Sequence, residues 1–110
     1  MPCKIKKKFI KRLHDGMKVY LVSGEAVRRQ QTSFIGGGTH STYPNLIPSG
    51  EIWIESGMKK GVDRNAIILH EDTEYRAMRY GHFGYGKAHR IANEAEAFYR
   101  KMKDKGSGKY

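Results

Sequence analysis

The sequence contains almost no cysteine and no long apolar run. Cys3 is the single cysteine among 110 residues, so one chain can form no internal disulfide and no Cys-x-x-Cys zinc site. No apolar stretch approaches the roughly 20 residues that a transmembrane helix needs, and the N-terminus is basic where a signal peptide would be apolar. We therefore expect a cytoplasmic protein that has no membrane partner.

Acidic residues are also scarce. The chain has 11 aspartates and glutamates against 21 lysines and arginines, which gives a net charge of +10. Such an excess favours either binding to nucleic acid or another polyanion or solubility supplied by two basic tails. Much of the excess lies in residues 1–12 and 101–109, so any contact with nucleic acid is expected through the basic termini.

The length and composition fit one domain. A hydrophobic content of 38% with 29% charged residues is typical of a globular chain, and this length supports one modest core. We predict a basic N-terminal segment over residues 1–16, a single α+β domain over residues 17–102 and a flexible basic tail over residues 103–110. The oligomeric state is left open.

The first half of that domain predicts a small, mainly antiparallel sheet over residues 17–56. Residues 17–22 are rich in β-forming side chains, and residues 51–55 alternate strictly between two faces. Ser23 and Gly24 indicate a tight turn, after which residues 25–31 are expected to return as a polar strand.

The second half predicts an antiparallel pair of helices packed on the sheet. The first helix is expected over residues 64–80, with Asp63 or Asn65 as its N-terminal cap and Gly81 as its stop. The link that follows is short, which forces the second helix, residues 87–102, to run antiparallel to the first.

The most informative stretch is the middle of the first helix. His70 and Glu74 lie one turn apart on a side that they share with apolar residues, whereas Asp72 is expected on the wet side. Burying an unpaired carboxylate is costly, and a metal ion held jointly with His70 would give Glu74 a partner. Glu71 lies at the edge of this face, where it could touch a metal-bound water without being a ligand.

The second helix offers the remaining ligand. A catalytic metal needs three protein ligands and an open position for water. His89 is the first choice; Glu96, about 10 Å further along the helix, is the alternative ligand or a group that orients a histidine. With Glu71 as general base, the set predicts hydrolysis by metal-activated water. Its mixed ligands suit Zn²⁺ first, and also Fe²⁺ or Mn²⁺.

Two further candidate residues follow a glycine run. Residues 36–38 are expected as a flexible turn or bulge, although three glycines would also let the backbone approach a ligand closely. His40 and Tyr43 come next and could face the same pocket as His70; an ordinary loop position is the other interpretation of His40.

An explanation without a metal is also open. Arg76 or Arg90 could neutralise Glu74 or Glu96 in buried ion pairs.

Several segments resemble a group of small phage and bacterial proteins that look like minimal zincin-type metallopeptidases. The matching residues are 23–28, 37–40, 47–48, 51–54, 69–71 with 74, and 88–89 with 92 and 96. The resemblance covers roughly residues 19–100 and implies a short sheet packed on a helix that bears the metal motif. The resemblance adds His40 to the site. For a protein encoded by a phage, it also implies a location in the cytoplasm of the host cell. Glu74 stands where zincins have the second histidine of His-Glu-x-x-His.

We therefore expect a metal-dependent hydrolase, a zincin-like peptidase acting on a peptide or protein. Zincin sites hold the substrate along an edge strand, and residues 51–55 are the candidate strand. One alternative is a metal-dependent phosphoesterase or nuclease, which the charge of +10 would suit. The other is a non-enzymatic basic phage accessory protein that binds nucleic acid.

Overall fold

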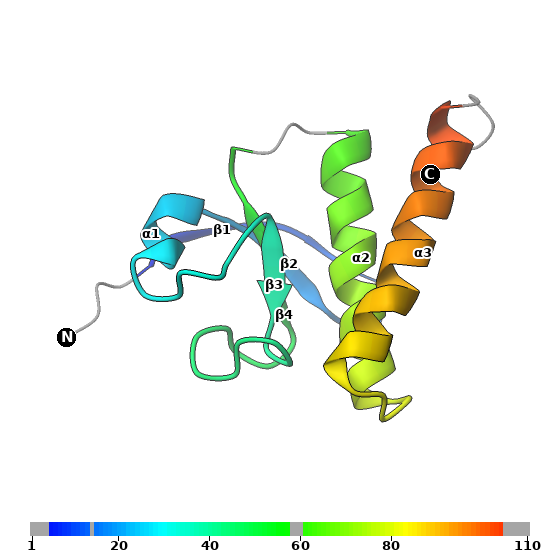
Figure 1. The fold of residues 1–110 in the computed structure, drawn as a ribbon. Helices are drawn as coiled ribbons and strands as arrows, with labels where there is room; N and C mark the ends of the chain where they lie inside the picture. The colour runs from blue at the N-terminus through cyan, green and yellow to red at the C-terminus, as the bar shows by residue number, and fades with distance from the viewer. Residues whose placement is uncertain (1–4, 14, 58–60, 105–110) are drawn as a thin grey trace.

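A computed structural model describes residues 5–13, 15–57 and 61–104 of the chain (Figure 1). Cys3 and the part of the predicted tail beyond residue 104 lie outside these residues. The elements are, in chain order, β1 (Lys7–Arg12), β2 (Lys18–Val22), α1 (Gly24–Arg28), β3 (Gly37–Thr39), β4 (Glu51–Glu55), α2 (Val62–Arg79) and α3 (Tyr85–Asp104).

The four strands form one sheet in the order β1-β2-β4-β3. The outer pairs, β1 with β2 and β3 with β4, are antiparallel, and the central pair of β2 and β4 is parallel. The predicted α+β class is confirmed, with a mixed sheet. The sheet begins at Lys7 rather than at residue 17, because β1 pairs along β2.

The predicted return strand over residues 25–31 is wrong. The Ser23 hydroxyl accepts a hydrogen bond from the Ala26 backbone N–H at 3.2 Å, which makes Ser23 the N-cap of the short helix α1. Val27, on the inner side of this helix, is fully buried. A helix fits here because β2 and β4 are parallel, and parallel neighbours need a crossover connection rather than a hairpin.

The two faces of the sheet carry separate hydrophobic clusters. One lies under α2 and includes Val19, Ile52 and Ile54 from the strands and Ile68 and Tyr75 from α2. The other lies on the face covered by α1 and the loops around β3, and it consists of Val22, Val27, Phe34, Ile47 and Trp53. Figure 1 shows the resulting order: α1, sheet, then the two long helices.

The two long helices lie side by side, as predicted, and run antiparallel (Figure 1). Ala88 and Ala92 of α3 are fully buried, and their small size allows the close approach. The predicted cap is wrong, because Gly61 is the N-cap residue of α2 and no side chain caps this helix. In the described residues, no helix is long and apolar enough to cross a membrane.

Two of the three glycines in the run belong to a strand rather than to a flexible turn or bulge, and Gly36 lies at a bend just before it. Gly37 and Gly38 belong to β3 and are buried. A Cβ atom on Gly38 would lie 2.7 Å from the Tyr43 ring, and one on Gly37 would lie 3.2 Å from Ile67 Cγ2. These glycines are therefore required by close packing of the strand against its neighbours.

Candidate metal centre

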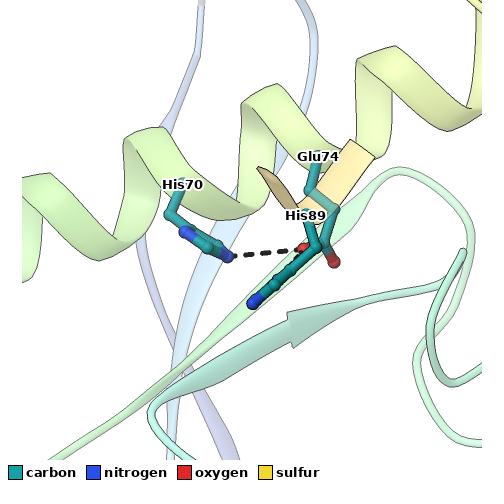
Figure 2. A group of neighbouring side chains, drawn as sticks. All are labelled: His70, Glu74 and His89. Atoms are coloured by element: carbon teal, nitrogen blue, oxygen red, sulfur yellow. Dashed lines mark hydrogen bonds and ion pairs between the residues drawn. The ribbon is translucent and has the colours of Figure 1, made fainter. Parts of the chain in front are cut away.

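The two long helices bring together the three residues that were chosen as metal ligands. His70 and Glu74 lie one turn apart on α2, and His89 reaches them from α3 (Figure 2). Glu74 Oε2 lies 3.4 Å from His70 Nε2 and 2.8 Å from His89 Nδ1. One ligand atom from each of the three residues lies within 4.8 Å of the other two.

Glu74 is the centre of this cluster. It is only 3% exposed, and its second oxygen accepts a hydrogen bond from Thr42 Oγ1 at 3.2 Å. Burial by itself would raise the pKa of Glu74, but the hydrogen bonds from His70 and His89 outweigh burial and lower that pKa. The hydrogen bond between His70 and Glu74 also raises the pKa of His70, although burial opposes this shift.

Glu96 lies behind His70 rather than among the ligands. Its Oε1 atom is 3.0 Å from His70 Nδ1, on the side of the ring away from Glu74. The contact lacks the directional geometry of a hydrogen bond, so Nδ1 has no hydrogen-bond partner among the described residues. Arg100 donates to Glu96 Oε2 at 3.0 Å and to Asp63 at 2.7 Å, which fixes the carboxylate. This position is consistent with the orienting role, which was the second option for Glu96.

Neither arginine proposed as a substitute for the metal is the partner of these carboxylates. Within the described residues, Glu96 pairs with Arg100 instead of Arg90, and Glu74 contacts Thr42 and the two histidines instead of Arg76. Among the described residues, Glu74 therefore contacts two imidazoles and one hydroxyl group but no arginine.

Glu71 lines the same pocket and is 8% exposed. Burial raises the pKa of Glu71 to about 7, and the charge of Glu74 adds to the shift. Among the described residues it forms no hydrogen bond or ion pair. Its carboxylate is thus available to a molecule bound in the pocket.

Asp72 does not lie on a wet face as predicted. It is 9% exposed, and burial together with a hydrogen bond to Asp15 raises the pKa of Asp72 to about 7. Helix periodicity places Asp72 on the outer side of α2, but the turn before β2 covers this side. Asp15 thus contacts Asp72 and opposes the ionisation of its carboxyl group.

The two candidates from the loop after β3 have different positions. Tyr43 lines the pocket together with the cluster. His40 does not line it: its Nδ1 donates to the Ile47 carbonyl at 2.7 Å, which ties the loop to itself. His40 is thus a structural loop residue, the alternative that the sequence had left open.

Sequence reasoning missed three residues of the site. Thr42 and Tyr85 line the pocket, and Arg100 anchors Glu96. Tyr85 stacks on the His89 ring, with centroids 5.3 Å apart. Tyr85 lies four residues before His89, and Arg100 lies four residues after Glu96. This i, i+4 spacing could have indicated Tyr85 and Arg100 from the sequence. No sequence pattern pointed to Thr42, because a loop far away in the chain places it.

The residues present fit a metal ion. Two imidazoles and one carboxylate form a ligand set used by catalytic zinc sites, and the pocket beside them has a volume of about 190 Å³. Glu74 Oε2 faces two histidine rings whose centroids lie 5.0 Å apart, so the three side chains converge on one place. His70, Glu74 and His89 are therefore a candidate metal centre with an accessible side.

Known proteins add no information about this centre. Comparisons with family models, curated proteins and solved structures found no significant match to the chain. The interpretation of the site therefore rests on its geometry and chemistry.

Proposed function

We propose that the chain is a metal-dependent hydrolase, a minimal zincin-like peptidase. The observation that carries the proposal is the cluster of His70, Glu74 and His89, whose ligand atoms lie within 4.8 Å of one another beside an open pocket. Zn²⁺ is the first choice for the ion, with Fe²⁺ or Mn²⁺ as alternatives.

Each residue has a defined task in this proposal. His70, Glu74 and His89 hold the ion, which when bound acts as a Lewis acid that lowers the pKa of a water ligand towards about 7. Glu71 lines the same pocket without an internal partner, so its carboxylate accepts the proton of the attacking water and returns it to the leaving amine. Thr42 and Glu96 keep Glu74 and His70 in position.

The proposed substrate strand has to be reassigned. The sequence suggested residues 51–55, but β4 is an inner strand with β2 on one side and β3 on the other, so it cannot accept another strand. β3 is the sheet edge, and Gly37 and Gly38 line the pocket that holds the cluster. We therefore place an extended peptide along β3, where backbone hydrogen bonds would hold it beside the ion.

Metal content and activity test this proposal together. Protein purified without a histidine tag should contain about one zinc, iron or manganese per chain by elemental analysis, and His70→Ala should lose it. Glu71→Gln should keep the metal and lose at least about 100-fold in cleavage of fluorescently labelled casein, because it removes only the general base. Glu94→Gln, an exposed glutamate on α3, is the matched control and should change neither.

Three outcomes would contradict the proposal. No metal after incubation with zinc, iron or manganese would exclude the centre. Full activity of Glu71→Gln would exclude the general base. Cleavage of an oligonucleotide but not of casein by the metal-loaded protein would favour the phosphoesterase alternative.

A further inference from the structure

A second cavity lies at the opposite edge of the sheet from the candidate metal centre. Its volume is about 510 Å³, and it lies between β1 and the start of α2. Three cationic residues line it, Lys8, Lys11 and Arg64, above an aliphatic floor formed by Ile10, Leu21 and Ile68. β1 and β3 are the two opposite edges of the sheet, with β2 and β4 between them, so this cavity is a separate site.

A β-bulge places the two lysines on one side of the strand. Lys8 and Lys11 are an odd number of residues apart, and regular alternation would put them on opposite faces. The register instead shifts between Phe9 and Lys11, so that Lys8 opposes Leu21 and Lys11 opposes Val19. Leu21 and Val19 both belong to the face that packs under α2. The bulge therefore turns both lysines towards the cavity.

Within the described part of the chain, no acidic side chain neutralises the positive charge of the cavity. Among the described residues, no carboxylate lines the cavity, and Lys8, Lys11 and Arg64 form no ion pair. Asp63, the acidic residue in the first turn of α2, is neutralised by Arg100 at 2.7 Å. Like charges held together without a counter-charge repel one another, which an anionic ligand would relieve.

Two unsatisfied groups point to the same kind of ligand. The Arg64 Nε atom is buried and has no hydrogen-bond partner, although leaving a buried donor unpaired costs free energy. Gly61, the uncapped start of α2, also lines the cavity, and the backbone N–H groups of a helix start favour anions. Both features favour an anion such as phosphate in the cavity.

We propose that this cavity binds a phosphate group of a nucleic-acid backbone through Lys8, Lys11 and Arg64. Lys6, just before the edge strand, is also exposed, and the net charge of +10 supplies long-range attraction. No aromatic side chain lines the cavity, so the bases have no stacking surface and binding is independent of sequence. The proposal does not depend on the metal centre.

Binding of a fluorescein-labelled single-stranded oligonucleotide, followed by anisotropy, is the first test. The double variant Lys8→Gln/Lys11→Gln should weaken binding by on the order of tenfold or more and flatten its dependence on salt. Arg90→Gln/Lys101→Gln removes the same charge from exposed positions on α3 and should change the affinity less than about threefold. Thermal unfolding of both variants checks the fold.

Nuclear magnetic resonance tests the contact itself in the unmodified protein. The side-chain Nε–H signal of Arg64 should shift when the oligonucleotide is added, and should shift in the same direction with inorganic phosphate. Treatment with EDTA or the His70→Ala substitution should leave the binding intact, which separates this site from the metal centre.

Four results would overturn the proposal. Equal losses of affinity in the two double variants would indicate that only net charge matters, and binding only to phosphatidylserine vesicles would indicate a membrane surface. The other two are no oligonucleotide binding and an Arg64 signal that does not move. In the first case the lysines of β1 would serve only to keep the sheet edge from pairing with other chains.

Discussion

At the scale of single residues, the candidate metal centre depends on how each histidine nitrogen is used. His70 directs Nε2 towards Glu74, while Nδ1 faces Glu96 at 3.0 Å. Arg100 holds Glu96, so a chain of contacts runs from the surface to the ring. Partners of this kind fix the orientation of a ligand and change its basicity. Glu96 should therefore tune the affinity for the metal without binding it.

Replacement of Glu96 by glutamine tests this role. We expect Glu96→Gln to bind zinc about 10- to 100-fold more weakly than the unmodified protein, whereas loss of a ligand in His89→Ala should abolish the site. Isothermal titration calorimetry with zinc measures both. Glu94→Gln, on the exposed side of α3, is the control. If Glu96→Gln removed all binding, Glu96 would be a ligand.

At the scale of elements, α1 is tied to the sheet by one ion pair. Arg28 of α1 donates to both carboxylate oxygens of Glu55 on β4, at 2.9 and 3.1 Å, and the Gly36 N–H donates to the same carboxylate at 3.2 Å. The hydrogen bond from Arg28 holds the pKa of Glu55 below its ordinary value, against the opposing effect of burial. This carboxylate therefore joins the helix, the start of β3 and the end of β4.

The lowered pKa gives a pH-dependent stability. Because the folded-state pKa of Glu55 is lowered, its stabilisation is fully present above the unfolded-state pKa of about 4.3 and is lost as the pH falls through the lower folded-state value. Glu55→Gln should unfold at a lower urea concentration than the unmodified protein at pH 7, and the difference should shrink below about pH 4.

Glu25→Gln is the control for this comparison. It removes an exposed pair between Glu25 of α1 and Arg29, the residue that follows the helix, and should leave the urea midpoint nearly unchanged at both pH values. A difference between Glu55→Gln and the unmodified protein that stayed constant with pH would mean that the charge of Glu55 is not what stabilises the fold.

At the scale of the whole molecule, the metal would connect the last helix to the rest of the fold. α3 packs chiefly on α2, and the candidate ligands come from both helices. A ligand that binds only the native state stabilises it by mass action. Zinc binding should therefore raise the stability of the complete chain instead of acting only locally.

Thermal unfolding with and without zinc measures this linkage. With free zinc about 100-fold above its dissociation constant, we expect a gain of about 2.7 kcal/mol and an increase in Tm on the order of 10 °C relative to protein in EDTA. Magnesium should have little effect on a site with two imidazole ligands. His70→Ala should show no increase; the same increase in that variant would place the zinc elsewhere.

Much of the centre could be predicted from local periodicity. The helical spacing placed His70 and Glu74 on one buried face, and the short link after α2 placed α3 antiparallel to it. These features depend on residues close in the sequence, where the geometry of one helix or one short loop decides the outcome. The strand over residues 51–55 was found for the same reason.

The errors concern features that depend on distant parts of the chain. Asp72 is buried because the turn before β2 covers it, and β4 is an inner strand because β3 pairs along one side and β2 along the other. Strand order, sheet edges and burial by another segment leave no mark on local periodicity. The sequence by itself determined which side chains share a helix face. Only the tertiary structure decided that Glu96 lies against His70, that β3 is the edge beside the cluster, and that Lys8, Lys11 and Arg64 share one cavity.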